Sequence, residues 1–339
     1  MIPQGSATRS AIQRSVAALL GVERAENILS GLEIDPALAS AKGITRAQAA
    51  MALNAVLFAQ LLDRVPTAAR YVGAVFAGGR RICFDHGALR TIDGPTGALP
   101  RGRAAFARLL EPLGYRIGGI YPLPRLKMTG HVFTHADFPE VVPQFFVSEL
   151  HVDQLPGTAQ VAAQRVFGAS SDPLDDAARS MLDALASQGR CTPEQASAGL
   201  PALVRAFGRH HRDPALSDYE ALLEHSAEAA WIATEGNAFN HATDRVPDVV
   251  ALSAELERQG FPLKPAVEHS ASGRVHQTAF LADKVVRTFT DAAGQPVTRE
   301  VPGSFYEFIT RDVDPASGKL DLSFDSGNAT GIFAMTEAR

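Results

Sequence analysis

The chain has 339 residues, 46% of them hydrophobic and 20% charged, which suits one large globular domain or two modest ones. A net charge of −5 argues against a nucleic-acid-binding protein, whose surface would carry a basic stripe. No apolar run approaches the roughly 18 residues that cross a bilayer, and the N-terminus lacks a signal peptide's pattern. Two distant cysteines, Cys83 and Cys191, disfavour a disulfide framework and a thiolate zinc site. We expect a cytoplasmic protein that binds neither membrane nor nucleic acid.

The first half of the chain is expected to change from helices to strands. Residues 7–62 repeat apolar residues at helical spacing, and Pro66 marks the end of this region. Residues 71–78 and 80–92 are typical of strands, and residues 102–113 of an amphipathic helix. Three further strands are expected between residues 114 and 153.

The second half repeats this change. Residues 157–232 are Ala-rich and helical, and strand character returns at 236–246. A helix is expected at 246–260, followed by short strands at 261–266, 275–283, 284–291 and 304–313. Residues 291–294, with the sequence DAAG, are typical of a hairpin loop.

Two segments of the chain therefore share one pattern of strand, helix and strands, at about 80–153 and 236–313. Both helices end in a related turn around Gly114 and Gly260. The opening strands are also alike: one carries Phe84-Asp85-His86 with Arg90 four residues later, and the other carries Phe239-Asn240-His241 with Arg245 four residues later. Paired βαβββ modules that open on a histidine strand are the pattern of the vicinal-oxygen-chelate, or glyoxalase-like, fold.

The expected fold is therefore α+β, with two such modules forming a cupped mixed sheet. We predict an N-terminal helical layer at 1–65, a first module at 66–156, a helical insertion at 157–232 and a second module at 233–339. Together they are expected to form one compact unit.

His86 and His241 are the first candidate metal ligands. A single histidine on a strand is more often structural than a ligand. Here two histidines hold the same place in related modules, and pseudo-twofold symmetry would bring their strands together at the sheet centre. Their imidazoles could then share one divalent ion.

Glu307 is the candidate third ligand. Strand alternation puts Phe305 and Glu307 on one face and Tyr306 and Phe308 on the other. A carboxylate buried beside phenylalanine is unfavourable unless it is paired or bound to a metal. An ion pair with an arginine is the alternative role, and Glu149, at the related place in the first module, is the competing ligand.

Arg90 is the candidate substrate-binding and catalytic residue. It shares a strand face with His86, four residues earlier, so its guanidinium would point into the same cup. Arginine is well suited to a bidentate contact with a carboxylate. The alternative is a structural ion pair with Asp85, Asp93 or Glu149.

Gln277 and His276 are candidate substrate-binding residues on a strand of the second module. They would line the pocket if that strand faces the cup. The alternative is that they lie on the solvent face of the strand.

The chain resembles the 2-oxoadipate dioxygenase/decarboxylase family over roughly residues 10–335. The marks of that family are a His-Gly-Ala-[Ile/Leu]-Arg segment, a later Asn-His segment and a glutamate on a Gly-Ser-[Phe/Tyr]-x-Glu-Phe strand. In this sequence they are His86-Gly87-Ala88-Leu89-Arg90, Asn240-His241 and Gly303-Ser304-Phe305-Tyr306-Glu307-Phe308.

The resemblance implies that His86, His241 and Glu307 hold Fe(II) and that Arg90 binds substrate. The implied reaction converts 2-oxoadipate and O2 to D-2-hydroxyglutarate and CO2. Longer members carry an arginine where this chain has His276, which puts the identity of the 2-oxo acid in question more than the metal site.

Two other functions stay open at this point. Zinc or nickel could occupy the same ligands in a glyoxalase-type lyase or isomerase, which would need no O2. The third hypothesis is a non-catalytic protein that binds a small ligand. The sequence also leaves open whether the chain forms a homodimer.

Overall fold

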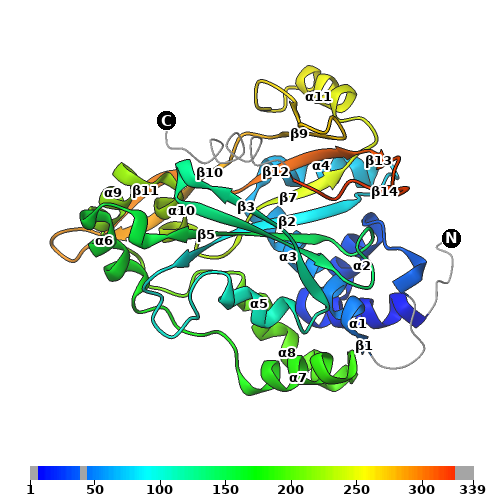
Figure 1. The fold of residues 1–339 in the computed structure, drawn as a ribbon, viewed down its shortest axis with the longest axis horizontal. Coiled ribbons are helices and arrows are strands. Elements are labelled where there is room, and N and C mark those ends of the chain that lie inside the picture. The colour runs from blue at the N-terminus through cyan, green and yellow to red at the C-terminus, as the bar shows by residue number, and fades with distance from the viewer. Residues whose placement is uncertain (1–6, 39–43, 325–339) are drawn as a thin grey trace.

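The computed structural model describes residues 7–38 and 44–324, which form a central sheet with helices around it (Figure 1). The helices are α1 (Ala7–Leu20), α2 (Val22–Gly31), α3 (Arg46–Arg64), α4 (Pro66–Ala77), α5 (Ala104–Leu110), α6 (Gly157–Phe167), α7 (Asp176–Gln188), α8 (Pro193–Ala206), α9 (Leu216–His225), α10 (Ala227–Glu235) and α11 (Val249–Arg258). None of the helices in these ranges is both long and apolar enough to span a membrane.

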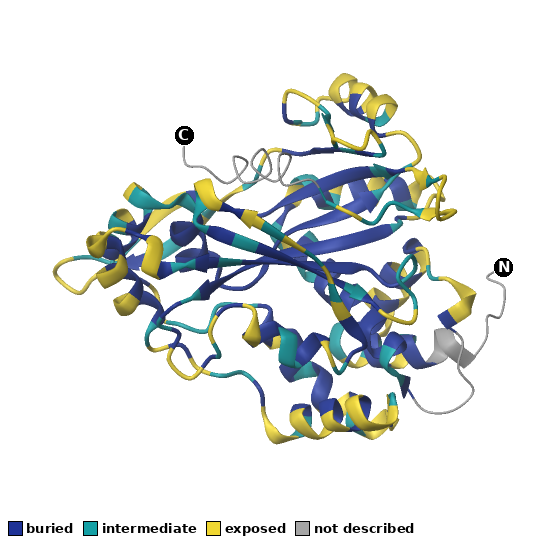
Figure 2. Ribbon diagram, viewed as in Figure 1, coloured by how far each residue is buried: buried dark blue, intermediate teal, exposed yellow. Residues whose placement is uncertain are grey.

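The central sheet has eight strands and is mixed. In spatial order they are β3 (Tyr115–Leu123), β4 (Met128–His135), β5 (Gln144–His151), β2 (Phe84–Asp93), β7 (Phe239–Arg245), β12 (Phe305–Arg311), β9 (Val275–Ala279) and β8 (Glu268–His269). The strands β2 and β7 pair antiparallel at the centre, whereas β2 with β5 and β12 with β7 pair parallel. Figure 2 shows that these central strands are buried along most of their length.

This strand order confirms the predicted fold class and its repeat. The first module supplies β2, α5, β3, β4 and β5, and the second supplies β7, α11, β8, β9 and β12. Each contributes four neighbouring strands, and the first strand of each lies at the centre. Gly114 and Gly260, at the related turns after α5 and α11, both have positive φ, at 95° and 74°.

One face of the sheet packs on the N-terminal helices. Phe58 of α3 contacts Phe84 with ring centroids 5.2 Å apart, and Tyr71 of α4 contacts Phe308 at 4.9 Å. Tyr306 joins the same aromatic cluster, at 5.7 Å from Tyr71. The even-numbered residues of β12 therefore face the core, which leaves the odd-numbered ones for the opposite face of the sheet.

The insertion between the modules is helical, as expected. It forms α6 to α10: α8 packs against α1, α3 and α7, and α6, α9 and α10 lie beside one end of the sheet (Figure 1). A short pair, β1 (Ile44–Thr45) with β6 (Arg190–Cys191), joins the N-terminal region to this insertion.

Two local predictions are wrong. A strand is expected at 71–78, but residues 71–77 belong to α4 and Gly78 caps its end, because Pro66 begins this helix rather than ending the helical region. Tyr71, Val72 and Val75 are buried at helical spacing, and their β-branched and aromatic character is misleading. Residues 261–266 also form no named strand; only Leu263 bridges to Phe280.

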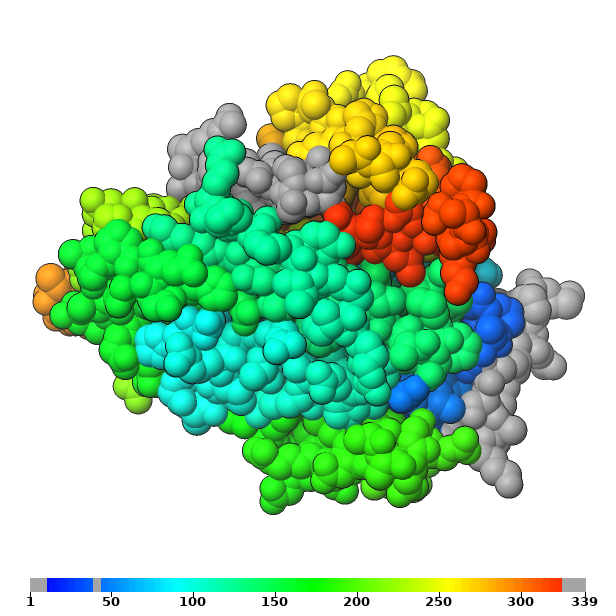
Figure 3. All heavy atoms as spheres, in the orientation of Figure 1, coloured from blue at the N-terminus to red at the C-terminus, as the bar shows by residue number. Residues whose placement is uncertain are grey.

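The predicted hairpin loop at 291–294 is confirmed. It joins β10 (Lys284–Thr290) to β11 (Pro296–Pro302), which pair with each other outside the main sheet. This two-stranded arm is inserted between β9 and β12 of the second module. After β12 the chain forms another small hairpin, β13 (Val313–Asp314) with β14 (Lys319–Leu320). In Figure 3 this red segment packs against the yellow residues before β9, where Arg274 pairs with Asp321 at 2.9 Å.

Gly87 is required by the close approach of the two modules. A Cβ at this position would lie 2.2 Å from the ring of Phe239 on β7. We predict that Gly87→Ala lowers the free energy of unfolding by about 1–3 kcal/mol through overpacking, measured by urea denaturation. The matched control is Gly73→Ala in α4, which has open space around it. It should instead raise stability, by about 0.5–1 kcal/mol. Equal effects of both changes would contradict this account of Gly87.

Candidate metal centre

Three neighbouring strands bring His86, His241 and Glu307 together on the face of the sheet opposite α3. In the register of the sheet His241 stands opposite Ala88 and Phe305, so it lies between β2 and β12. Glu307 stands opposite Thr243, and Thr243 stands opposite His86. Directly opposed residues share a face, so all three side chains point to one side.

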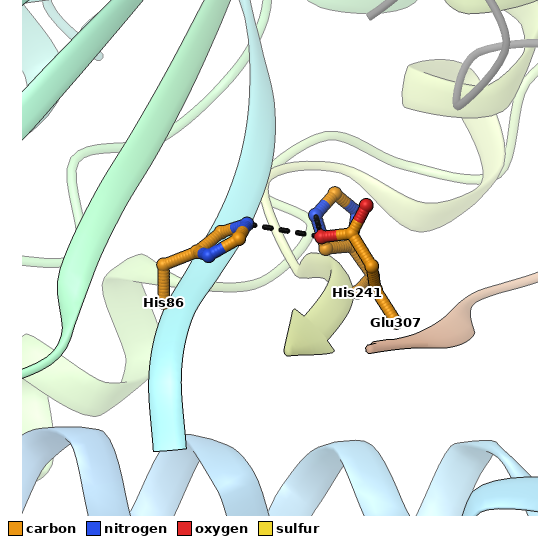
Figure 4. A group of neighbouring side chains, drawn as sticks. All are labelled: His86, His241 and Glu307. Atoms are coloured by element: carbon orange, nitrogen blue, oxygen red, sulfur yellow. Dashed lines mark ion pairs between the residues drawn. The ribbon is translucent and has the colours of Figure 1, made fainter. Parts of the chain in front are cut away.

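The three side chains converge on one point (Figure 4). His86 Nε2 lies 3.1 Å from Glu307 Oε2, and His241 Nε2 lies 3.5 Å from the same oxygen. All three are buried, and one ligand atom from each lies within 4.8 Å of the others. In the described ranges, no other group of three His, Cys, Asp or Glu side chains meets this condition.

Asp85, itself paired with Arg311, fixes the orientation of the His86 ring. The His86 Nδ1 atom lies 2.8 Å from Asp85 Oδ1, and Asp85 is paired with Arg311 at 2.9 Å. A bulge between Phe84 and His86, relative to β7, lets the neighbouring residues Asp85 and His86 meet in this way. An Nδ1 held by a carboxylate leaves Nε2 for a metal, which is the usual support of a ligating histidine.

Burial and the contacts around the three ligands shift their pKa values in different directions. Burial alone would raise the pKa of Glu307, but the charge of His241 and the contact with His86 lower it to about 2. Burial would lower the pKa of His86, yet its bonds to Asp85 and Glu307 raise it. Burial lowers the pKa of His241 to about 3, against the opposing effect of Glu307, and nearby cations such as Arg90 lower it further.

The donor set fits a divalent metal. Among the described residues, Glu307 Oε1 is buried without a hydrogen-bond partner. Buried polar atoms without partners are rare and ask for an explanation. Two imidazoles and one carboxylate on one face leave open positions around an ion, as in the facial triad of non-haem iron oxygenases.

Arg90 lies on the same strand as His86. Its ion-pair partner is none of the three acidic residues that the sequence indicates as alternatives. It is fully buried, and its Nε lies 2.8 Å from Glu228 on α10. Its guanidinium also lies over Trp231, at 4.8 Å from the ring centroid. The insertion between the modules therefore supplies its partners.

Glu149 lies apart from the three candidate ligands. It accepts from the backbone N–H of Arg103 and lies 2.7 Å from His131 Nε2. Its role as a competing ligand finds no support in this geometry.

Gln277 and His276 point to opposite faces of the sheet. Gln277 is buried and stands opposite Ile309, which shares a face with Glu307, so it lies on the side of the metal centre. His276 stands opposite Thr310, on the other face, and lies 2.6 Å from His269.

Sequence reasoning missed four residues around this centre. Thr243 donates to Glu307 Oε2 at 2.6 Å, and Phe324 packs its ring 4.9 Å from that of His86. Lys264 and Glu228 are buried charged side chains on a loop and a helix. A signal existed only for Thr243, which lies two residues after His241 and therefore shares its face.

Comparisons with known proteins agree with the fold. A 2-oxoadipate dioxygenase/decarboxylase of Oryza sativa is 26% identical over 306 residues, covering 81% of this chain and 75% of that protein. The crystal structure of a glyoxalase-superfamily protein from Ralstonia eutropha JMP134 is 50% identical, with a TM-score of 0.90, over 93% of this chain and 98% of that one. Hydroxyglutarate synthase from Oryza sativa, solved with 2-oxoadipate, has a TM-score of 0.66 at 23% identity, over 88% of this chain and 96% of that one.

The family comparison covers most of the chain. The sequence profile of the 2-oxoadipate dioxygenase/decarboxylase family matches residues 46–319, which include both modules and the insertion between them. All three strands that carry the candidate ligands lie inside this match. The chain belongs to the 2-oxoadipate dioxygenase/decarboxylase family.

Proposed function

We propose that this protein is an Fe(II)-dependent dioxygenase that converts 2-oxoadipate and O2 to D-2-hydroxyglutarate and CO2. The observation that carries the proposal is the buried group His86, His241 and Glu307, in a chain of this family. Its partnerless carboxylate oxygen, together with the open side that such a triad leaves, suits a metal that also binds substrate.

The protein residues have separate tasks in this proposal. Asp85 orients the His86 ring, and Thr243 orients the Glu307 carboxylate, so the ligand atoms are positioned before any metal arrives. Arg90 orients a carboxylate of the substrate, and Glu228 fixes the guanidinium from the other side. Bound Fe(II) would supply chelation of the 2-oxo acid and the redox chemistry of O2.

The proposed reaction balances without another reductant. The carbon–carbon bond next to the 2-oxo group breaks, and the first carboxyl group leaves as CO2. One oxygen atom of O2 enters the new carboxyl group and the other enters the hydroxyl group of the product. Electrons for both come from the 2-oxo acid, so no separate oxo-acid co-substrate is required.

Oxygen consumption tests the function. Iron-loaded protein mixed with 2-oxoadipate should consume O2 and release CO2 in equal amounts, measured with an oxygen electrode and by product analysis. His86→Ala should lower the rate by more than about 100-fold, because loss of a ligand exceeds loss of an outer partner. The control is His225→Ala, a partly exposed histidine of α9 that contacts Thr158. It should leave the rate unchanged.

The outcomes separate the competing functions. Equal rates for wild type and His86→Ala would contradict the assigned centre. Turnover without O2, sustained by Zn or Ni, would favour a glyoxalase-type lyase or isomerase. Absence of any tightly held metal after purification without added metal would favour a non-catalytic binding protein.

Asp85→Asn should weaken metal binding by about 10–100-fold, because His86 loses the carboxylate that holds its ring. The measurement is competition with a chelator of known affinity. Asp93→Asn is the matched control, since Asp93 lies on the same strand but is partly exposed and pairs with His151. Unchanged affinity in Asp85→Asn would show that Asp85 serves only to balance the charge of Arg311.

Arg90→Lys should raise KM for 2-oxoadipate by about 10–100-fold, since an ammonium keeps the charge but loses the planar fork. Metal content should stay unchanged, because Arg90 is no ligand. The matched control is Arg108→Lys, which alters the partly buried pair of Arg108 with Asp172 away from the centre. An unchanged KM in Arg90→Lys would assign Arg90 to a structural pair with Glu228 alone.

A further inference from the structure

Lys264 is a buried cation that the proposed reaction has not yet used. It lies in the loop between α11 and β8, and only 4% of the residue is exposed. Its backbone N–H donates to the carbonyl of Ala279 at 2.9 Å, and Ala279 stands opposite Glu307 in the sheet. This anchors the loop beside β9, one strand away from the strand that carries Glu307.

The ammonium of Lys264 lies on the metal side of the sheet. It is 2.7 Å from Glu268, which stands opposite Gln277 on β8. Gln277 in turn stands opposite Ile309, so Glu268 shares a face with Glu307. Two strand spacings across the sheet and two residues along the strand separate Glu268 from Glu307, about 12 Å between their backbones.

A buried ammonium is costly unless an anion accompanies it. Glu268 fills that role here, but the two partners are buried unequally, with side-chain exposures of 4% for Lys264 and 20% for Glu268. Glu268 can therefore turn toward water while Lys264 stays enclosed. Among the described residues, Lys264 Nζ makes no well-aligned hydrogen bond, although an ammonium offers three donors.

We propose that Lys264 binds the far carboxylate of a 2-oxo dicarboxylic acid, and that Glu268 occupies this position until the acid replaces it. Gln277, whose side-chain amide donates to Glu268 at 3.3 Å, is then available to the same carboxylate. This inference rests on the proposed function, because the 2-oxo end of the acid is taken to bind at the metal centre. It makes Lys264 a specificity-determining residue that selects diacids over monoacids.

The test compares two acids that differ only in the far carboxylate, 2-oxoadipate and 2-oxohexanoate. Their Kd values are measured by calorimetry on Fe(II)-loaded protein without oxygen. Wild type should prefer the diacid. Lys264→Met should weaken binding of 2-oxoadipate by about 100-fold, as expected for loss of one partner of a buried charge pair. Binding of 2-oxohexanoate should change by less than about threefold, and Lys264→Arg should restore part of the preference.

Two further variants serve as controls, one for the loss of a lysine elsewhere and one for folding. Lys284→Met removes an exposed lysine of β10 that pairs with Glu300, and it should change neither Kd. If Lys264→Met leaves Glu268 stranded and fails to fold, the double variant Lys264→Met/Glu268→Gln removes that carboxylate and is tested in its place. Thermal unfolding and metal content establish that each variant is intact.

The outcomes distinguish this inference from the proposed function. If wild type prefers the diacid and intact Lys264→Met keeps that preference, the inference is overturned while the function stands. An equal loss for both acids would also overturn it, by assigning Lys264 to the fold or the metal centre. If wild type binds both acids alike, the inference fails whether or not oxygen is consumed. If wild type prefers the diacid through Lys264 but consumes no O2, the inference stands and the oxygenase proposal fails.

Discussion

The strands β2 and β7 pair antiparallel at the centre of the sheet. This pairing joins the first strands of the two modules, so that His86 and His241 lie side by side from segments about 150 residues apart in sequence. The parallel pairing of β12 with β7 then adds Glu307 on the same face. Gly87 permits this approach, because the ring of Phe239 occupies the space of a side chain there.

A chain of charges supports the central pair. Arg311 at the end of β12 binds Asp85 on β2, and Asp85 holds His86. The same guanidinium donates to the carbonyls of Asp321 and Ser323, which fixes the chain that leads to Phe324. A buried ion pair of this kind adds little stability by itself, since desolvation offsets its attraction. The ion pair serves instead to position groups, because Arg311 links the orientation of His86 to the segment whose Phe324 packs against the His86 ring.

The sequence was informative where the structure is local or repeated. The period of the strands and the shared opening motif predict both modules, and alternation along β12 assigns Glu307 and Tyr306 to opposite faces. At residues 71–78 propensity favours a strand, because residues such as Val72 and Val75 are β-branched, whereas packing of α4 against β12 and the start at Pro66 select a helix.

Contacts between distant segments were out of reach of such reasoning. Arg90 was predicted to face the cup, but its partner Glu228 belongs to a helix whose place over the sheet no local pattern specifies. Lys264 lies in a loop that was expected to be a strand, and its burial depends on how that loop folds against β9. Both residues are cations that become significant only when tertiary packing excludes water around them.

The ion pairs Arg90–Glu228 and Lys264–Glu268 explain how the site can hold two balanced cations when no acid is bound and still accept a dianion. Arg90 and Lys264 each carry a carboxylate partner, so neither cation is buried alone. The partners differ in freedom: the Glu228 side chain is 3% exposed and enclosed by the insertion, whereas that of Glu268 is 20% exposed at the edge of the sheet. An arriving acid can displace Glu268 into water at low cost, while Glu228 must stay and keep Arg90 in place. Lys264, the cation that would select the acid, therefore has the exchangeable partner, Glu268. Arg90, the cation that would orient the acid, has the permanent one.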